Sequence, residues 1–584
     1  MKKNKFILFL FCLVLCDVWN AAAGPARRGI ITKTQPDGTT IQLRLIGDEF
    51  GHAYALPDGT LVKKDENGCY RPFTMIENAC FQKTYDESRS AMRRLESSNH
   101  LSPTAGNSPA APYRMNDFSA QGTVRGIILL VAFKNVPFCT DSITTHELLS
   151  ARYNTPKYQE QFSYSFFSQA YNEQISVSGN ITGSARDYFR DQSLGMFEPT
   201  FDVFGPITLD NDRVYYGGND RNGRDANARG MVKDACQKAF DMRLTDFKDY
   251  DNDGDGYVDY VYIVYAGNDE AQFGSEECIW AHSWNLSTPL DLGGMKISQY
   301  ACSGELLIDS QDCPAGIGTF VHEFSHVIGL PDFYNTTIDD PAENDFCMDY
   351  WSIMDYGQYA LEGYCPVGYT SFERYSMGWI SAKELITPGS IALLPTDEAP
   401  SMYRAFVNDK DTTSYFVFET IQKTSWNNYR PNYGLMITGV NYNASLWATN
   451  LVNKDKKHHR YHIVPANNEY SYQNENNQLF GKDNFTFGPE TTPASVTQFG
   501  DTLFKPLTNI TRHKDGLCTF DFMGGANGLD ILPSNDNIST TVYTIEGKQL
   551  HLIISNSLPL EEQLPKGIFI ITQNGTARKI YIRE

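Results

Sequence analysis

The segment from residue 317 to residue 332 constrains the fold more than any other part of this 584-residue chain. From His322 to Asp332 it reads His-Glu-Phe-Ser-His-Val-Ile-Gly-Leu-Pro-Asp. Residues four positions apart lie on the same face of an α-helix, so the two imidazoles of this spacing point the same way. Apolar side chains recur at helical spacing on the other face, which predicts a helix packed on a core; they are Ile317, Phe320, Val321, Phe324 and Ile328.

The helix is expected to end just after the second histidine. Gly329 lets the chain leave the helix abruptly, and Pro331 prevents the helix from continuing. The backbone can then return and place Asp332 beside the histidines. Three protein ligands leave a fourth position open, which distinguishes catalytic zinc sites from closed structural ones. We therefore predict that His322, His326 and Asp332 bind Zn²⁺.

Glu323 follows the first predicted ligand directly. A carboxylate at this position can hydrogen-bond a water molecule at the metal without binding the metal itself. That is the position a general base requires. The pattern predicts hydrolysis by a metal-activated water with Glu323 as the general base, which would then protonate the leaving group.

A second cluster of carboxylates lies upstream, in an Asp- and Gly-rich loop. Side-chain oxygens alternate from Asp251 through Asp253 to Asp255, and Asp259 follows immediately before an apolar run. Alternating carboxylates around a glycine turn suit a hard cation such as Ca²⁺. The loop lacks the usual glutamate at its end, so it is not a standard helix-loop-helix site, and a solvated turn is the alternative. We predict that these four aspartates bind Ca²⁺.

The N-terminus has the pattern of a secretory signal peptide. Lysines precede an apolar run from Phe6 to Cys16, and small residues stand before Gly24. The run is shorter than the roughly 20 residues that span a bilayer, and no later stretch is long enough. A lipoprotein signal at Cys16 is the alternative, which the bulky Leu15 disfavours. The chain is predicted to be secreted, or exported and attached to the cell surface.

Composition limits the partners. Hydrophobic residues make up 41% of the chain, which is ample for buried cores, and the formal net charge of −21 would repel nucleic acid. We therefore expect no nucleic acid partner and no stable membrane span.

Turn signals and composition divide the chain into segments. Short strand-like runs give way to a linker rich in Ser, Pro, Ala and Gly at residues 97–112, and a buried strand at Gly126–Phe133 opens a new domain. Short β runs separated by turn residues follow Trp379. The expected boundaries are 1–23 for the signal peptide, 24–115 for a small β-rich propeptide and its linker, 116–380 for the catalytic domain, 381–525 for a β-rich, sandwich-like domain and 535–584 for a C-terminal β-rich tail.

Downstream of the predicted ligands, Tyr350-Trp-Ser-Ile-Met354-Asp-Tyr356-Gly357 resembles the methionine turn of the metzincin peptidases. The resemblance implies that Met354 forms an apolar floor beneath the zinc. Tyr356 matches a tyrosine that in some metzincins stabilises the oxyanion, so a catalytic role is implied for it. The alternative is an ordinary packed aromatic residue.

These motifs together resemble the immune inhibitor A family of bacterial secreted metallopeptidases, in which Asp replaces the usual metzincin His as third ligand. The similarity covers much of residues 120–525. It implies an α+β fold, with a zincin or metzincin-like catalytic domain preceded by a β-rich propeptide and followed by all-β domains. It also implies a zinc endopeptidase acting on proteins or peptides. One departure is that Glu419-Thr-Ile-Gln422 stands where relatives tend to read Glu-Asn-Arg.

Two other functions compete with this one. The chain could be a cell-surface adhesin or carbohydrate-binding protein with a degenerate peptidase core, although the intact ligand set argues against that. It could also hydrolyse a non-peptide substrate, which the family resemblance disfavours. The last fifty or so residues are similar to tails that direct proteins through type IX secretion in Gram-negative bacteria, and a plain accessory β domain is the alternative.

The cysteines raise the question of how the predicted precursor is kept inactive. Ten of the twelve cysteines follow the signal peptide, and an exported chain can pair them in disulfides. Cys69 or Cys80 could supply a thiolate to the open zinc position. The rival, which we favour, is a Cys69–Cys80 disulfide with the cleft blocked by backbone or by an Asp.

Overall fold

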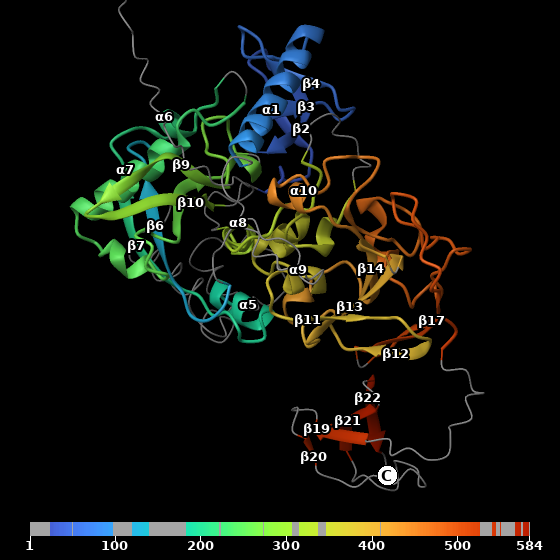
Figure 1. Ribbon diagram of the computed structural model, residues 1–584. Helices are drawn as coiled ribbons and strands as arrows, with labels where there is room; N and C mark the ends of the chain where they lie inside the picture. The colour runs from blue at the N-terminus through green and yellow to red at the C-terminus, as the bar shows by residue number, and fades with distance from the viewer. Residues whose placement is uncertain are drawn as a thin grey trace, which may run out of the picture. The chain divides into compact units, whose positions relative to one another are not determined.

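The structure is a computed structural model (Figure 1). It divides into two compact units, one formed by residues up to 342 together with 352–367 and 444–454, the other by residues 343–351, 368–443 and 455–584. The predicted signal peptide and the predicted linker lie outside the described residues. The described residues are 24–48, 51–96, 120–138, 183–220, 223–272, 274–306, 315–336, 346–408, 410–514, 516–525, 540–544, 549–550, 567–573 and 576–582.

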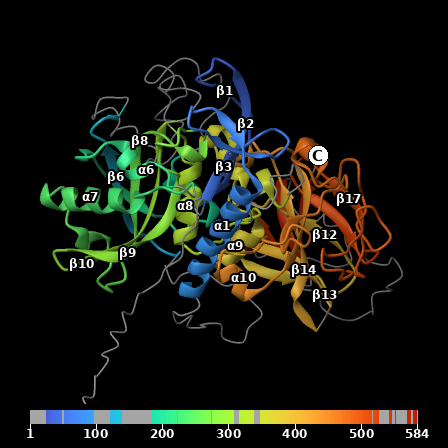
Figure 2. The same ribbon diagram turned by 90° about the horizontal axis from the view of Figure 1, so that it is seen from above.

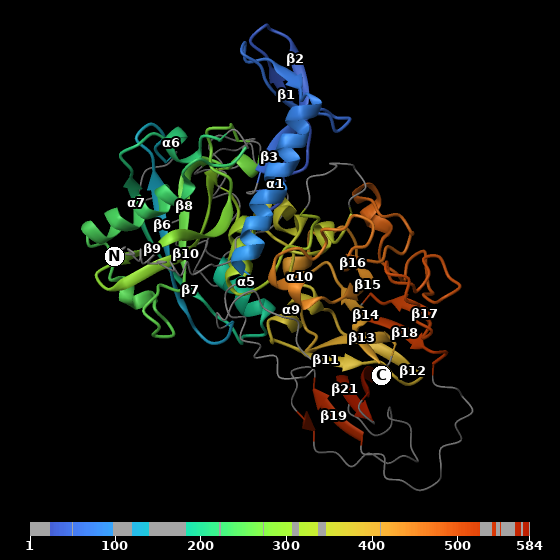
Figure 3. The same cartoon turned by 45° about the horizontal axis from the view of Figure 1, so that its top comes forward.

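The first unit begins with a small antiparallel sheet, in the strand order β1-β2-β3-β4-β5. Its strands are β1 (Ile31–Thr34), β2 (Thr40–Asp48), β3 (Gly51–Ala55), β4 (Leu61–Lys64) and β5 (Tyr70–Pro72). Helix α1 (Met75–Glu96) follows and runs along this sheet in Figure 3. Phe81 and Tyr85 of α1 pack against Ala55 and Leu61 of the strands. The region is therefore a sheet covered by a helix, with a core of its own.

The sequence predicts only a β-rich region here and does not predict helix α1. Turn signals predict the strands well, but the helix shows only a short apolar face at Phe81 and Tyr85 among many polar residues. Its packing on the sheet supplies stability that the local pattern does not display.

A five-stranded sheet forms the centre of the first unit, in the order β7-β6-β8-β10-β9. Strands β6, β7, β8 and β10 are parallel, and β9 at the edge is antiparallel to β10. Figure 2 shows the same sheet from above. The strands are β6 (Arg125–Ala132), β7 (Thr200–Thr208), β8 (Val261–Asn268), β9 (His282–Leu292) and β10 (Met295–Leu306).

Helices flank this sheet, and the helix that carries the His-Glu motif packs on it. They are α5 (Ala185–Gln192), α6 (Arg213–Gly217), α7 (Ala228–Asp241) and α8 (Gly318–Val327). In α8, Phe320 and Phe324 stack on each other and meet Phe201 of β7. Both also contact Tyr260, just before β8. This aromatic cluster anchors α8 to the sheet through the apolar face that the sequence predicts.

The second unit is built mainly from β-strands. One sheet has the order β11-β13-β14-β15-β16 and another the order β12-β18-β17, and both contribute to one apolar core that includes Phe416, Phe418 and Phe520. Helix α9 (Ser371–Ser376) also belongs to this unit. The strands are β11 (Ser381–Glu384), β12 (Gly389–Leu393), β13 (Ser401–Asn408), β14 (Asp411–Ile421), β15 (Gly434–Asn441), β16 (Tyr461–Ile463), β17 (Leu507–Arg512) and β18 (Cys518–Phe522).

Three segments fall in a different compact unit from the one that the expected boundaries give. Residues 444–454, which include α10 (Ala444–Ala448) and lie between β15 and β16, belong to the first unit, whereas residues 346–351 and 368–380 belong to the second. The C-terminal residues form a further sheet in the order β20-β19-β21-β22. Its strands are β19 (Thr540–Thr544), β20 (Gln549–Leu550), β21 (Gly567–Gln573) and β22 (Thr576–Ile582).

The favoured Cys69–Cys80 disulfide is wrong, because both cysteines are free thiols. Cys69 is half-buried in the turn between β4 and β5, and Cys80 lies on the exposed side of α1. The sheet and helix form an apolar core of their own, so no disulfide is required to hold them together. The other described cysteines are also free, namely Cys236, Cys278, Cys302, Cys347, Cys365 and Cys518. Among the described helices, none combines the length and apolar character needed to cross a membrane.

Candidate metal centre

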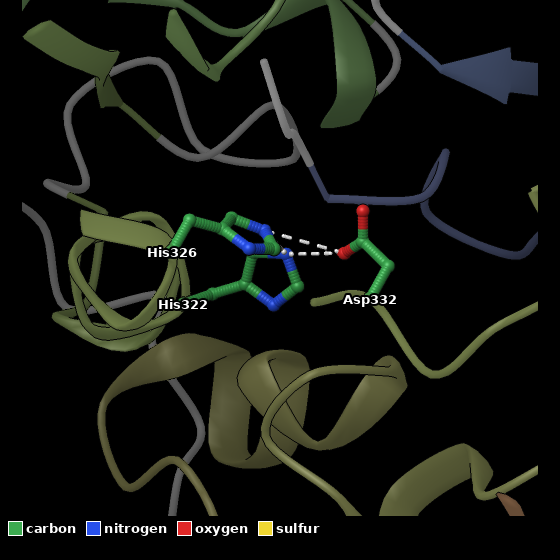
Figure 4. A group of neighbouring side chains, drawn as sticks. All are labelled: His322, His326 and Asp332. Carbon is green, nitrogen blue, oxygen red and sulfur yellow. Dashed lines mark hydrogen bonds and ion pairs between the residues drawn. The ribbon is translucent and has the colours of Figure 1, made fainter. Parts of the chain in front are cut away.

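Helix α8 and the chain that follows it bring the three predicted ligands together (Figure 4). The Nε2 atoms of His322 and His326 lie 3.2 Å apart, and each lies 3.3 Å from Oδ1 of Asp332. All three side chains are buried, none with more than 2% of its surface exposed. The helix ends as predicted, since Gly329 adopts a left-handed φ of 107° and Leu330 donates back to the Ser325 carbonyl.

The other nitrogen of each imidazole fixes the orientation of its ring. Nδ1 of His322 lies 2.8 Å from the Ile353 carbonyl, and Nδ1 of His326 lies 2.7 Å from the Leu330 carbonyl. A carbonyl accepts only from N–H, so Nδ1 carries the proton and Nε2 presents its lone pair toward Asp332. Such outer contacts are what orient histidine ligands in metal sites.

Asp332 is held by a residue from a distant part of the sequence. Its backbone N–H donates to Oδ1 of Asn450 at 2.6 Å, and its Oδ2 accepts from Nδ2 of the same Asn450 at 2.6 Å. Asn450 follows α10 in segment 444–454 and is buried. Asn453 of that segment donates to the Phe333 carbonyl at 2.7 Å. The segment therefore clamps the ligand loop and leaves Oδ1 of Asp332 directed at the imidazoles.

The electrostatics of the site favour an ionised Asp332 and a neutral His322. Burial would raise the pKa of Asp332, but His326 and His322 hold it below its ordinary value. Burial lowers the pKa of His322, and Asp332 only partly opposes that shift. A carboxylate and neutral imidazoles are the protonation states in which these groups bind metal.

The separations of the three ligand atoms fit a zinc ion. Tetrahedral zinc with bonds of about 2.0–2.1 Å places its ligand atoms about 3.3 Å apart. The three separations here are 3.2, 3.3 and 3.3 Å. The donor set and its spacing therefore suit Zn²⁺.

Met354 and Tyr356 take different positions relative to this group. Met354 is fully buried, and its carbonyl accepts from the backbone N–H of Phe333 at 2.8 Å, directly after the third ligand. Tyr356 begins the short 3₁₀ helix η4 (Tyr356–Gly363) and is half-buried. Its hydroxyl donates to the Ala26 carbonyl at 3.1 Å. In this structure that hydroxyl therefore binds residues 24–28, which we call the N-terminal segment.

The N-terminal segment also reaches the predicted general base. Glu323 is fully buried on α8, and its Oε1 accepts from the backbone N–H of Gly24 at 3.1 Å. A Cβ added to Gly24 would lie 2.4 Å from Nε2 of Gln358, so a larger residue there would require the end of that side chain to shift. In Figure 4 the blue ribbon of the N-terminal segment passes beside the three ligand side chains.

Three successive carbonyls of this segment accept hydrogen bonds from aromatic side chains. Trp280 Nε1 donates to the Gly24 carbonyl at 3.4 Å, Tyr359 to the Pro25 carbonyl at 2.8 Å and Tyr356 to the Ala26 carbonyl. Beyond them, the backbone N–H of Arg27 donates to the Ala271 carbonyl at 2.8 Å. The contacts are made mostly to the backbone, as they would be to a peptide of any sequence.

The predicted calcium loop brings three of its four aspartates together. Carboxylate oxygens of Asp251, Asp253 and Asp255 lie within 4.8 Å of one another. Oδ2 of Asp259 instead accepts from the backbone N–H and from Nδ2 of Asn252, at 2.6 and 2.8 Å. Burial raises the pKa of Asp259, and Asp253 and Asp255 add to the shift.

Three residues at the site belong to no recognisable spacing in the sequence. Asn450, Trp280 and Tyr359 reach it from three separate segments. No signal pointed to Asn450, which lies 118 positions from the carboxylate it holds.

A metallopeptidase catalytic domain is the class of protein that this group of two histidines and one aspartate indicates, and comparison with known families supports it. Residues 116–382 match the model of the immune inhibitor A peptidase M6 catalytic domain. This match confirms, for this part of the chain, the family resemblance that the sequence indicates.

Named relatives support the same assignment. The chain is 27% identical to pre-pro-metalloprotease PrtV of Vibrio cholerae over 303 residues, covering 46% of this chain and 32% of that protein. It is also 27% identical to immune inhibitor A of Bacillus thuringiensis subsp. alesti over 219 residues, covering 33% of this chain and 31% of that protein. The matches thus span about a third of the length of these relatives.

Proposed function

We propose that the chain is a secreted zinc endopeptidase that hydrolyses peptide bonds in proteins. The observation that carries this proposal is the buried group of His322, His326 and Asp332 with Glu323 beside it on the same helix. A zinc ion held by these ligands would supply a Lewis acid that polarises the scissile carbonyl. The intact ligand set gives no support to a degenerate core in an adhesin.

The protein's own residues would position the substrate and move the proton. Glu323 would take a proton from the attacking water and return it to the nitrogen of the leaving amine. Trp280 and Tyr359 would donate hydrogen bonds to backbone carbonyls of the substrate, as they do to those of the N-terminal segment. The role of Tyr356 in stabilising the oxyanion stays a prediction.

We further propose that the region before the catalytic domain keeps the enzyme latent. The backbone of the N-terminal segment occupies the approach to Glu323. A cleft blocked by backbone, like one blocked by an Asp, is an alternative to a cysteine thiolate bound at the zinc. Removal of a leader before Gly24 would turn the nitrogen that contacts Glu323 into an α-amino group, which is largely cationic at neutral pH. That charge would strengthen its pairing with the Glu323 carboxylate.

Digestion of an unfolded protein tests the main proposal. The processed protein is prepared with zinc, stripped with a chelator and reloaded, and zinc content is measured beside hydrolysis of casein and of ester and glycan substrates. We expect one zinc per chain, loss of casein hydrolysis on stripping and recovery on reloading. A zinc-loaded protein that cleaves esters or glycans but no polypeptide would contradict the proposal.

A further inference from the structure

The side chain of His52 is enclosed by Glu270, Asn219 and Trp280, next to the N-terminal segment, and we call the space that it fills the pocket. Glu270, in the short 3₁₀ helix η2 (Glu270–Gln272), is fully buried, and Trp280 forms one wall. His52 of β3 fills this pocket. Its Nε2 lies 3.1 Å from Oε1 of Glu270 and 3.1 Å from Nδ2 of Asn219. Its ring stacks on Trp280 with centroids 4.3 Å apart and planes 23° apart.

Nδ1 of His52 lies 3.3 Å from the backbone carbonyl of Asp48, an acceptor, and Nε2 faces both the Glu270 carboxylate, an acceptor, and Nδ2 of Asn219, a donor. The imidazolium can donate to both acceptors, whereas a neutral ring protonated at Nδ1 can accept from Asn219. Burial opposes the charge of the imidazolium, yet Glu270 and then Asp48 raise the pKa of His52 above its ordinary value, which favours the charged ring. The pocket is therefore built to hold a cation.

Two further buried carboxyl groups lie near the pocket. Asp269 is buried next to Glu270, and burial raises its pKa to about 6. Asp225 accepts from the Trp280 backbone N–H, and burial and then Glu270 raise its pKa. Within the described part of the chain, Oε2 of Glu270 and Oδ1 of Asp225 have no hydrogen-bond partner. A buried carboxylate in that position favours the arrival of a cation.

The pocket adjoins the backbone groups that bind the N-terminal segment. Trp280, which stacks on His52, also donates to the Gly24 carbonyl, and Ala271, which follows Glu270, accepts from Arg27 N–H. A second ion pair joins Lys64 of β4 to Glu276 at 3.1 Å. The region of strands β1–β5, which we call the N-terminal region, therefore brings two basic side chains, His52 and Lys64, to the chain between β8 and β9. When that region leaves, the pocket opens beside the substrate path.

We propose that the pocket formed by Glu270, Asn219 and Trp280 is a substrate subsite for a cationic side chain, and that His52 occupies it in the precursor. This inference rests on the proposed peptidase function. The ligand class is the side chain of Lys, Arg or protonated His in a peptide substrate. Glu270 supplies the charge, and the Trp280 ring supplies a face on which a cation stacks.

The first experiment asks whether the pocket binds a cation in the full-length, zinc-loaded protein. His52→Gly leaves space for imidazole, and imidazole binding at pH 6 is followed by calorimetry. We expect binding to His52→Gly, none to the unaltered protein and at least about tenfold weaker binding when Glu270→Gln is added. Asp210→Asn, which removes an exposed carboxylate, serves as the matched control. Equal imidazole binding by His52→Gly and by the double variant with Glu270→Gln would refute the proposal that the pocket binds cations.

The second experiment asks whether the pocket selects substrates. The processed enzyme is assayed on a peptide library that varies Lys, Arg, His, Gln and norleucine at each position. We expect a basic preference at one position, lost in Glu270→Gln and kept in Glu270→Asp and Asp210→Asn. A preference that survives Glu270→Gln, with an unchanged melting temperature, would overturn the subsite. If the unaltered enzyme cleaves no peptide, the proposed function fails, whereas the imidazole titration still decides whether the pocket binds cations.

Discussion

Asn450 binds Asp332 at both ends, because its amide oxygen accepts from the Asp332 backbone and its amide nitrogen donates to the carboxylate. The third ligand is therefore oriented by a residue of segment 444–454, which belongs to the same compact unit although it lies far away in the sequence. This pairing satisfies Oδ2 and leaves Oδ1 toward the metal side. We regard Asn450 as a positioning residue, since it touches the ligand and not the substrate.

Removing this clamp should weaken zinc binding. We expect Asn450→Ala to raise the zinc dissociation constant by about 10- to 100-fold, the usual effect of losing an outer-shell partner. Asn450→Asp should do at least as much, because it places a second carboxylate against Asp332. Competition with a chromophoric chelator measures the constant, and the absorption spectrum of the cobalt-substituted protein reports ligand geometry.

Thr449→Ala is the control for that experiment, because the Thr449 hydroxyl donates to the Ser445 carbonyl and makes no contact with the ligand loop among the described hydrogen bonds. Its zinc affinity should match that of the unaltered protein. An Asn450→Ala protein with unchanged zinc affinity and an unchanged cobalt spectrum would show that Asp332 needs no clamp.

The contrast between α8 and Asn450 shows what the sequence can predict here. The ligand set, the end of the helix at Gly329 and the buried face through Phe320 and Phe324 all follow from spacing and from residues close together in the chain. Asn450 depends on where a distant loop folds, and no local pattern encodes that. The disulfide prediction failed for a related reason, since cysteine spacing cannot reveal that Cys69 and Cys80 belong to a region with its own core.

Glu323→Gln should separate metal binding from proton transfer. The three ligands are untouched, so one zinc per chain should remain, while hydrolysis should fall by about 10²–10⁴-fold with the loss of the base. Zinc content by plasma spectrometry and peptide hydrolysis by the processed protein measure the two effects. Near-normal hydrolysis by the zinc-loaded variant would remove Glu323 from the proposed role.

Calcium removal should destabilise the loop from Asp251 to Asp259. The grouped carboxylates of Asp251, Asp253 and Asp255 repel one another without a cation. We expect a calcium-selective chelator, with zinc kept saturated, to lower the melting temperature by about 2–4 °C for each kcal/mol of binding free energy lost. Asp253→Asn should abolish this response, and Asp259→Asn should reduce it less, since Asp259 is hydrogen-bonded to Asn252. A melting temperature that does not change with calcium concentration would show that the loop is a simple turn.

Latency should depend on the N-terminal segment and not on the cysteines. The double variant Cys69→Ser and Cys80→Ser should stay inactive as a full-length precursor, because neither thiol is used in the described structure as a metal ligand. Deleting residues 24–28, with the new N-terminus verified by mass spectrometry, should release activity without cleavage of the chain. Premature activity of the cysteine variant would restore the thiolate switch, and a full-length precursor as active as the processed enzyme would refute latency altogether.

Docking of the N-terminal region should weaken as pH rises. The groups facing His52 are Glu270, Asp48, Asn219 and Trp280, and the charged ones raise its pKa above the ordinary value of 6.5. The stabilisation from His52 is therefore complete below that ordinary pKa and is lost as pH rises through the raised one. Thermal melting of a Glu323→Gln precursor, compared with and without His52→Gln across pH 5.5–9, isolates this contribution from the titration of Asp225 and Asp269. We expect the two curves to lie apart at low pH and to converge at high pH. Curves separated by a constant amount over the whole range would show that His52 docks as a neutral ring.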